Sequence, residues 1–502
     1  MGDKTKQYML GIDQSTQGTK AILFDEAGQI VCRQDVPHRQ IINDLGWVSH
    51  DLEEIYANTL KAVQLVVGKA GIQRDGIAGV GISNQRETSA AWGADGKPVC
   101  NAIVWQCARA QEICSRIEEE GKDRHIAEQV KEKTGLNLSP YFPAAKYAWI
   151  LENEEEAMRL CRESSLHLGT IDSFLIYRLT KGTVFRTDYS NASRTQLFNI
   201  HTLSWDPELC EIFGVPQSAL AEVCDSDCDF GKTDFEGYLD EPIPICGVLG
   251  DSHAALFGQG CHKAGMVKAT YGTGSSVMMN IGEKPVMSQN GLVTSLAWSL
   301  NGKAEYVLEG NLNYTGAVIT WLKDDVGLIS SPGETQEMAK NAAAEDKTYL
   351  VPAFSGLGAP YWDSEARASL SGMSRTTGRN EIVRAALDCI AYQITDILMA
   401  MSEDAGMSIE ELRVDGGPTR NQYLMQFQSD IAGIQVSIPP AEELSAIGAA
   451  YCAGISLGFY KKDELFQKEN RTIYLPSMNQ EKRDSLYAGW KEAVNSVLKT
   501  KS

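Results

Sequence analysis

Asp251 stands at the junction between an apolar run and a helix-like segment. Residues 243–249 (IPICGVL) predict a buried strand, and residues 252–257 (SHAALF) predict the start of a helix. In α/β proteins, a carboxylate at the carboxyl end of a strand and beside a helix N-terminus lies where general bases and metal contacts occur. Because aspartate is also a favoured N-cap residue, the position alone leaves both catalysis and helix capping open.

Three glycine- and hydroxyl-rich turns favour the catalytic interpretation. Each follows an expected strand: residues 13–20 (DQSTQGTK), 271–276 (YGTGSS) and 415–421 (DGGPTRN). Turns of this composition offer backbone N–H groups and hydroxyls that can cradle phosphates. Together with Asp251, they predict an ATP site.

Length and charge limit the class of protein and its partners. A chain of 502 residues with 43% hydrophobic and 22% charged residues predicts a globular protein of two or more domains. The net charge of -20 argues against a surface for nucleic acid or anionic membranes. An anionic cofactor would need a divalent cation and helix N-termini. Without an apolar signal core or a bilayer-length apolar run, we expect a cytoplasmic protein with no membrane insertion.

The twelve cysteines do not form an obvious metal or disulfide pattern. Cys100, Cys107 and Cys114 are too far apart for a short metal knuckle. Cys224 and Cys228 lie closer together, but no paired Cys/His set accompanies them. We expect reduced structural thiols, the usual state in intracellular chains.

The first part of the chain has the pattern of a meander followed by a helix. Residues 8–13, 19–25 and 29–36 predict three strands joined by short turns. Apolar residues recur at helical spacing over residues 50–67, and residues 77–82 predict a further buried strand.

The second half repeats this theme and resembles an internal duplication. The elements expected there are strands at 266–270, 276–281, 293–300 and 304–308, a strand and turn at 413–417, and helices at 381–401, 421–431 and 444–457. The last helix is rich in alanine and glycine, so it could pack closely against a neighbour. We place the domain boundary at 258–265, which divides the chain into 1–258 and 259–502. Two similar lobes would grip ATP from both sides and exclude water, as a kinase requires.

Longer sequence blocks carry a resemblance to a known family. They are 84–88 (NQRET), 101–107 (NAIVWQC), 187–195 (TDYSNASRT), 352–362 (PAFSGLGAPYW) and 425–430 (MQFQSD). On these blocks and the phosphate-type turns, the chain resembles the FGGY carbohydrate kinases, and most closely those that phosphorylate glycerol. The resemblance implies an α/β fold of two actin-like ATPase (ribonuclease H-like) domains around a central cleft, and by analogy a homo-oligomer.

The resemblance also implies a base, a metal site and a nucleotide site. Asp251 would take the proton from a terminal hydroxyl of the substrate as that hydroxyl attacks the γ-phosphorus of ATP. Asp13 and Asp251 would hold Mg²⁺, in the case of Asp13 through water, since magnesium retains its hydration shell. The nucleotide contacts implied are Thr16, Gln17 and Lys20 from the first lobe, and Thr273, Gly316, Thr320, Gly417 and Asn421 from the second. Thr320 stands where the family pattern has a glutamine.

A polyol substrate would be held by a mixture of polar and aromatic side chains. Arg86 and Glu87 would fix its hydroxyls as a donor and an acceptor side by side at a strand end. Trp105 and Tyr141 would cover its carbon chain. On composition alone, a solvated ion pair at Arg86 and Glu87 and core packing of Trp105 are the commoner outcomes, but the surrounding blocks reverse that preference. Lys146 also fits the family pattern, and we expect it to be mainly structural.

Three positions depart from the family pattern beside the expected substrate. Ser252 and His253 stand where glutamines are usual, and Ser276 replaces a phenylalanine that faces glycerol. The changes at Ser252 and Ser276 would widen the pocket and make it more polar, which is our hypothesis for a longer acceptor. His253 could contact the substrate or be a satisfied helix histidine.

The leading functional hypothesis is therefore ATP-dependent phosphorylation of a small polyol, most simply of glycerol to glycerol 3-phosphate. The alternative is a kinase for a longer polyol or a ketose, of the erythritol, xylitol or xylulose type. A third hypothesis is a non-catalytic actin-like sugar sensor. The presence of both Asp13 and Asp251 argues against it, because a sensor needs no base.

Overall fold

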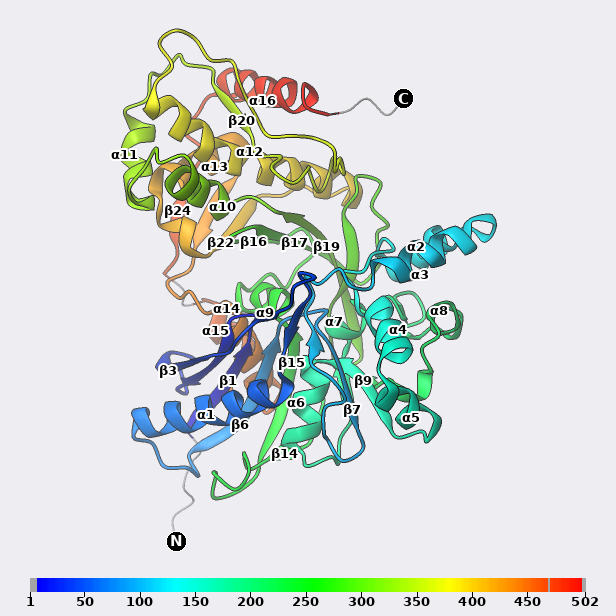
Figure 1. Cartoon of the computed structure of the whole chain (residues 1–502). Coiled ribbons are helices and arrows are strands. Elements are labelled where there is room, and N and C mark those ends of the chain that lie inside the picture. The colour runs from blue at the N-terminus through cyan, green and yellow to red at the C-terminus, as the bar shows by residue number, and fades with distance from the viewer. Residues whose placement is uncertain (1–6, 468–469, 499–502) are drawn as a thin grey trace.

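The computed structural model describes residues 7–467 and 470–498 and has two lobes, each built on a mixed β-sheet (Figure 1). The first sheet contains β1 (Tyr8–Gln14), β2 (Gly18–Phe24), β3 (Ile30–Pro37), β6 (Ile77–Asn84), β14 (Lys232–Thr233) and β15 (Ile243–Gly250). The second contains β16 (Val267–Tyr271), β17 (Ser275–Gly282), β18 (Val293–Leu300), β19 (Lys303–Leu312), β22 (Glu411–Asp415), β23 (Gln435–Ile438) and β24 (Thr472–Tyr474).

The two sheets share one strand arrangement. In the first, β3, β2 and β1 are antiparallel neighbours, and β1, β6 and β15 follow in parallel. In the second, β19, β17 and β16 are antiparallel neighbours, and β16, β22 and β23 follow in parallel. The expected pair of α/β lobes with a repeated meander is therefore confirmed.

Helices cover both faces of the first sheet. Those of the first lobe are α1 (Leu52–Ala70), α6 (Ile171–Leu179), α9 (Asp251–Gly258), α14 (Leu444–Ser456) and α15 (Lys462–Gln467). Those of the second lobe are α10 (Gly316–Thr320), α11 (Thr335–Lys340), α12 (Arg379–Ala405), α13 (Gln422–Ala432) and α16 (Gln480–Asn495). Because side chains of a strand alternate between faces, Leu10 packs in the core with α1 and α6, whereas Met9 packs in the core with α9 and α14.

A third sheet and several helices extend the first lobe, and most of them come from the chain between β6 and β15. This sheet has the order β4 (Ile41–Ile42), β5 (Val48–His50), β8 (Ala102–Ile103), β7 (Ser89–Gly93) and β9 (Leu166–Thr170). The helices are α2 (Gln111–Glu120), α3 (Ile126–Thr134), α4 (Pro143–Asn153), α5 (Glu155–Arg162), α7 (Tyr189–Ala192) and α8 (Pro207–Phe213). Two-stranded sheets pair β10 (Arg186–Asp188) with β13 (Glu222–Cys224), β11 (Phe198–Asn199) with β12 (Ser204–Trp205), and β20 (Tyr349–Val351) with β21 (Ser369–Ser371).

Strand β19 is longer than the sequence pattern predicts. The apolar run ends at Leu308, but the strand continues to Leu312 and includes Glu309. It pairs with β17 on one side and β18 on the other. Pairing on both sides reaches Glu309, which lies in the interior, and pairing with β17 alone extends the strand to Leu312.

Helix α14 comes from the second half of the chain but packs on the first sheet, against α9, β6 and β15. The approach is so close that a Cβ on Gly448 would lie 1.8 Å from the carbonyl oxygen of Ala254. The close packing expected for this helix is confirmed. The lobes are consequently not two consecutive stretches of chain, and the division at 258 and 259 stays a prediction about domains.

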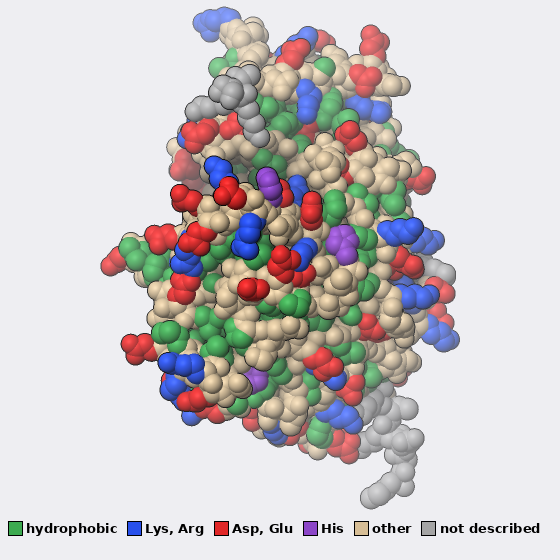
Figure 2. Space-filling view, turned by 90° about the vertical axis from the view of Figure 1, so that its right-hand side faces the viewer, with side chains coloured by type: hydrophobic (Ala, Val, Ile, Leu, Met, Phe, Trp, Pro, Cys, Tyr) green, Lys and Arg blue, Asp and Glu red, His purple; other side chains and the backbone are tan. Residues whose placement is uncertain are grey.

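Across residues 7–467 and 470–498, no helix combines the length and apolarity needed to cross a bilayer. The face of the molecule in Figure 2 carries acidic and basic side chains interspersed with one another.

Candidate active site

Asp251 opens helix α9 directly after strand β15. The N-cap position is Gly250, so Asp251 is the first residue of the helix and not its N-cap. Its Oδ1 accepts a hydrogen bond from the backbone N–H of the next residue, Ser252, at 2.6 Å. The expectation of an N-cap at Asp251 is therefore wrong, although its carboxylate binds one N–H group of the first turn. The side chain is 35% exposed, so the carboxylate can meet a ligand.

Arg86 joins Asp251 to the second lobe. Its Nε lies 3.2 Å from Asp251 Oδ1. Its Nη1 and Nη2 donate to the two carboxylate oxygens of Glu309, at 3.0 and 2.8 Å. Arg86 is only 6% exposed and the Glu309 side chain is fully buried. A solvated ion pair at Arg86 is therefore excluded.

Glu87 belongs to the same buried network. Arg194 Nε donates to Glu87 Oε1 at 2.6 Å, and Arg194 Nη1 lies 2.8 Å from Glu309 Oε2. Ser276 Oγ donates to Glu309 Oε1 at 3.2 Å. The guanidinium groups of Arg86 and Arg194 therefore lie between carboxylates of the first lobe and Glu309 of the second lobe.

Burial and charge act in opposite directions on these carboxyl groups. Burial raises the pKa of Asp251, the charge of Arg86 lowers it, and the nearby charge of Asp13 raises it further. For Glu309, burial would raise the pKa, but Arg194 and Arg86 together hold it well below its ordinary value. Glu309 is therefore held in its ionised form, whereas the pKa of Asp251 is raised from its ordinary value.

The first phosphate-type turn brings Asp13 and Lys20 together across β1 and β2. The two residues are register partners, and Lys20 Nζ lies 3.4 Å from Asp13 Oδ2. The same ammonium group donates to Glu443 Oε2 at 2.8 Å, and Ser83 Oγ donates to Asp13 Oδ1 at 3.0 Å. Glu443, just before α14, was not found from the sequence, because no local motif links it to the turn. Gln17 is exposed, and its carbonyl accepts the His38 N–H at 3.2 Å.

The oxygen ligands available near this turn fit a magnesium ion. Asp13 and Asp251 supply carboxylate oxygens and lie close enough for the charge of one to raise the pKa of the other. Within the described ranges, no cluster of three or more His, Cys, Asp or Glu side chains could form an all-protein metal cage. Magnesium is usually held by one or two carboxylates together with phosphates and water, so this ligand set is suitable.

Trp105 and Tyr141 form an aromatic wall near the first turn. Their ring centroids are 5.5 Å apart, and Trp105 Nε1 donates to Thr16 Oγ1 at 3.0 Å. The ammonium group of the fully buried Lys146 holds the backbone of this wall, donating to the carbonyls of Trp105 at 3.4 Å and Pro140 at 2.7 Å, and to that of Tyr141. Burial lowers the pKa of Lys146 to about 7.

The turn that contains Thr273 packs against the start of α10. The N–H of Gly316 donates to the carbonyl of Gly272 at 2.9 Å, and the N–H of Ala317 donates to that of Thr273 at 3.0 Å. A Cβ on Gly316 would lie 2.7 Å from the Gly272 carbonyl oxygen. The glycine at 316 therefore permits this close contact.

A cavity of about 600 Å³ brings together four of the predicted nucleotide residues: Gly316, Thr320, Gly417 and Asn421. Its other lining includes Thr335, Gln336, Leu387, Ile390 and Leu424. The sequence did not reveal these lining residues, because they lie on helices that carry no phosphate-type turn. They line one pocket only in the folded chain. The size is that of a typical cofactor site.

Asn421 links two walls of this cavity. Its side chain accepts the N–H of Leu424 at 3.1 Å as the N-cap of α13, and its Nδ2 donates to Thr335 Oγ1 at 3.1 Å. The neighbouring Gln422 N–H donates to Gln336 Oε1 at 2.8 Å. The start of α13 is thereby fixed to α11.

His253 is a buried, neutral histidine. Its Nε2 lies 3.3 Å from Ser295 Oγ on β18, and burial, with the charge of Arg86, lowers its pKa well below the usual value. It therefore packs between the lobes. The contact between Ser252 and a substrate stays a prediction.

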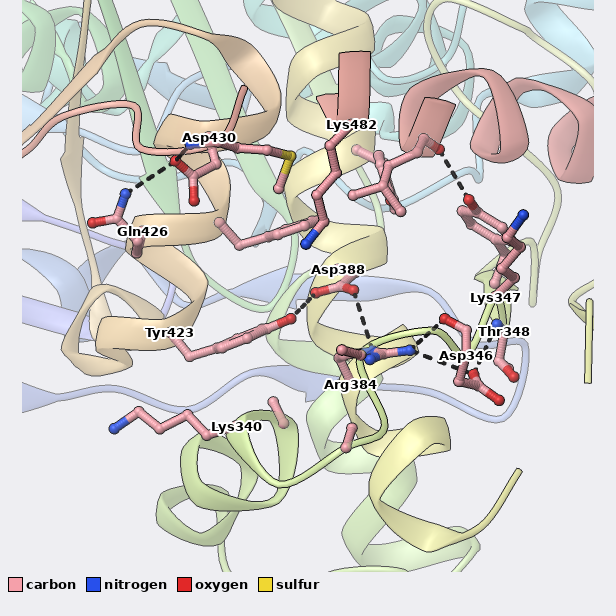
Figure 3. A pocket seen from close by; sticks show the side chains of 18 residues that line it. Lys340, Asp346, Lys347, Thr348, Arg384, Asp388, Tyr423, Gln426, Asp430 and Lys482 are labelled. Atoms are coloured by element: carbon pink, nitrogen blue, oxygen red, sulfur yellow. Dashed lines mark hydrogen bonds and ion pairs between the residues drawn. The ribbon is translucent and has the colours of Figure 1, made fainter. Parts of the chain in front are cut away.

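A second cavity, of about 290 Å³, lies between α11, α12, α13 and α16 (Figure 3). None of the predicted site residues lines it. At its base the Tyr423 hydroxyl donates to Asp388 at 2.9 Å, and Arg384 Nε lies 3.9 Å from the same carboxylate (Figure 3). Burial raises the pKa of Asp388 to about 7.

Comparison with known proteins gives matches over nearly the whole chain. The N-terminal domain of the FGGY family of carbohydrate kinases matches residues 8–258, and the C-terminal domain of that family matches residues 267–457. Glycerol kinase 1 of Thermotoga maritima is 49% identical over 98% of this chain and 99% of its own length. A glycerol kinase of Thermoanaerobacter sp. is 46% identical with the same coverage.

Solved structures show the same fold. Plasmodium falciparum glycerol kinase with ADP is 34% identical, has a TM-score of 0.92 and is covered over 100% of both chains. Xylulose kinase from Lactobacillus acidophilus is 22% identical, has a TM-score of 0.86 and covers 97% of this chain and 98% of its own. The second match bears on the fold alone.

Proposed function

Because the chain belongs to the FGGY family of carbohydrate kinases, we propose that it transfers the γ-phosphoryl group of ATP to a terminal hydroxyl of glycerol, forming glycerol 3-phosphate. Relatives named glycerol kinases, 45–49% identical over 98% of the chain, support this acceptor. The observation that carries the proposal is Asp251, a partly exposed carboxyl group of raised pKa beside Arg86.

Asp251 acts as the general base. It accepts the proton of the hydroxyl group while the hydroxyl oxygen forms a bond to the γ-phosphorus and the bond from that phosphorus to the bridging oxygen of ADP breaks. The products are the phosphate ester, ADP and one proton, which Asp251 returns to solvent. The positive charge of Arg86 lowers the free energy needed to keep the Asp251 carboxylate ionised.

Arg86 also orients the acceptor. A guanidinium group has five N–H donors, of which two bind Glu309 and one faces Asp251. Two therefore remain for hydroxyl groups of the acceptor. Glu87 offers an acceptor oxygen beside them, and Trp105 and Tyr141 cover the carbon chain.

The cavity of about 600 Å³, lined by Gly316, Thr320, Gly417 and Asn421, supports a nucleotide site in the second lobe. Thr273 would meet the phosphates from the same lobe. Thr16, Gln17 and Lys20 meet the phosphates from the first lobe. Asp13 and Asp251 would hold Mg²⁺, which would supply positive charge to the transferring phosphoryl group. Closure of the lobes excludes water, which competes with the alcohol.

A longer polyol or ketose is the second candidate acceptor. The hydroxyl of Ser276 contacts Glu309 at 3.2 Å and makes the wall near Arg86 polar.

A homo-oligomer and a cytoplasmic location also stay predictions. Light scattering would test the oligomeric state, and cell fractionation would test the location.

A coupled ADP-release assay with Mg-ATP tests the acceptor over glycerol, erythritol, xylitol and ketopentoses. We expect glycerol to have the highest kcat/KM. A much higher efficiency with another acceptor would replace glycerol, and ATP hydrolysis without phosphorylation of any acceptor would overturn the kinase assignment.

A further inference from the structure

Glu309 is the buried carboxylate that holds the acceptor site together from the second lobe. It lies on β19, fully buried, between β17 and β18. Arg86, which follows β6 of the first lobe, binds both of its carboxylate oxygens, and Arg194 binds one of them. A carboxylate in this position restrains both the place and the rotation of the Arg86 guanidinium group.

The charges around Asp251 and Glu309 come from several elements. Asp251 interacts with Arg86, with Asp13 on β1 and with Lys268 on β16. Glu309 interacts with the charges of Arg194 and Arg86, lies near the neutral His253, and raises the pKa of Lys268. Glu309 is the acidic group of this set that belongs to the second lobe and binds Arg86 directly. Removal of the Glu309 carboxylate would leave the buried guanidinium groups of Arg86 and Arg194 without enough nearby negative charge to balance them.

We propose that Glu309 is a positioning residue for phosphoryl transfer, which fixes Arg86 from the second lobe so that the Arg86 Nε faces Asp251 and its free N–H groups face the acceptor. This inference rests on the proposed function of the site. It also means that the acceptor site is complete only when the two lobes meet at this ion pair.

The Glu309→Gln variant tests the role, because it keeps the shape of the side chain and removes its charge. We expect the acceptor KM to rise about tenfold or more, with the ATP KM changed less than about twofold.

Glu305→Gln is the matched control. Glu305 lies on the same strand and accepts a hydrogen bond from Asn280 Nδ2 at 2.7 Å, so its loss perturbs β19 without touching Arg86. We expect it to leave the acceptor KM unchanged. Glu309→Asp keeps the charge but shortens the side chain, so it should move the Arg86 guanidinium group and raise the acceptor KM.

An unchanged acceptor KM in folded Glu309→Gln, in an active wild-type background, would overturn the positioning role. If Glu309→Gln does not fold, Glu309→Asp decides by itself: a wild-type acceptor KM in that variant contradicts a geometric role. The assay uses whichever acceptor the wild-type enzyme phosphorylates best. The proposed function fails separately, if no acceptor is phosphorylated at all.

A second inference concerns Cys224 and Cys228. Their Sγ atoms are 2.7 Å apart, and both residues are half-buried free cysteines. A disulfide has a sulfur separation of about 2.05 Å, so little movement separates the two states. The segment between them ties the two lobes: Asp225 accepts hydrogen bonds from Ser299 Oγ and Gly302 N–H, both at 2.6 Å.

The geometry points to a reversible disulfide between Cys224 and Cys228. The two thiols lose two electrons and two protons to a small oxidised disulfide such as glutathione disulfide, which is reduced to two thiols by way of a mixed disulfide. The bond would close a short loop around the contact between Asp225 and the hairpin of β18 and β19. Oxidation would therefore stiffen the connection between the lobes.

Alkylation after incubation with glutathione disulfide tests this pair. We expect two thiols to become resistant to alkylation, both within the peptide that carries residues 224–228, and to recover with dithiothreitol. The Cys224→Ser variant should lose this protection, whereas Cys161→Ser, at another half-buried cysteine, should keep it. Full alkylation of both thiols, or only mixed disulfides with glutathione, would overturn the inference.

Discussion

Arg86 Nε lies 3.2 Å from Asp251 Oδ1, while Nη1 and Nη2 of the same guanidinium group each donate one hydrogen bond to Glu309. The residue expected to orient the acceptor therefore also controls the charge of the expected base. Burial raises the pKa of Asp251, which makes it a better proton acceptor than an exposed aspartate. The positive charge of Arg86 opposes this increase in the pKa.

Replacing Asp251 with asparagine should nearly abolish phosphoryl transfer. The amide cannot accept the hydroxyl proton, and a positioned base contributes about 10²–10⁴-fold. We expect kcat to fall by this factor while ADP binding, measured by calorimetry without Mg²⁺, stays within about twofold. Transfer at the wild-type rate in this variant would exclude Asp251 as the base.

The activity should depend on pH through the ionisation of Asp251. The base is active when ionised, and its raised pKa means that activity is lost on acidification at a higher pH than an ordinary aspartate would give. We expect kcat/KM to fall with unit slope on the acid side. Ser252→Ala, beside Asp251 but without a charge, serves as a control that should leave the acid limb in place.

Much of the fold could be predicted from local sequence patterns. The first meander, the strand before Asp251 and the helix that begins after Asp51 follow from alternation, apolar runs and capping residues. The packing of α14 on the first sheet could not be predicted, because it depends on contacts between distant parts of the chain.

The same limit applies to the site. The turns at Asp13 and Thr273 have local composition that indicates phosphate binding. Glu309 is 223 residues from Arg86 in sequence, and Glu443 is 423 residues from Lys20. Each is an ordinary acidic residue in its local context, so only the folded chain identifies it as a partner.

Loss of the Lys146 ammonium group should weaken binding of the acceptor and not binding of the nucleotide. Its ammonium group donates to the backbone carbonyls of Trp105, Pro140 and Tyr141. Lys146→Met removes these donors and loosens the aromatic wall, so we expect the acceptor KM to rise about tenfold. The ATP KM is the internal control. An equal increase in both constants would indicate a general loss of structure.

Ser276→Phe should narrow the range of acceptors. The serine hydroxyl contacts Glu309 at 3.2 Å, and a phenyl ring there would replace a polar wall with apolar cover. We expect kcat/KM for xylitol and ketopentoses to fall by about tenfold or more relative to glycerol. Ser276→Ala, which removes only the hydroxyl, should have a smaller effect. An unchanged ratio in Ser276→Phe would show that this wall does not select the acceptor.

The burial of Asp388 should lower the free energy of unfolding of the protein above neutral pH. Its side chain is 13% exposed, and burial raises its pKa from 3.8 to about 7. Between these values the unfolded chain is ionised at this position while the folded chain is protonated. Stability therefore decreases as pH rises through this range, by up to about 4 kcal/mol above pH 7.

Asp388→Asn removes this penalty and keeps an oxygen for the Tyr423 hydroxyl. We expect its melting temperature to exceed that of the wild type at pH 8 and to be similar at pH 4. Asp346→Asn is a control of opposite sign. Although burial opposes the shift, hydrogen bonds from Thr377 and Thr348 lower the pKa of Asp346, so its loss should destabilise the protein at pH 8 and have less effect in acid. The same pH dependence in the wild type and Asp388→Asn would contradict a buried, protonated Asp388.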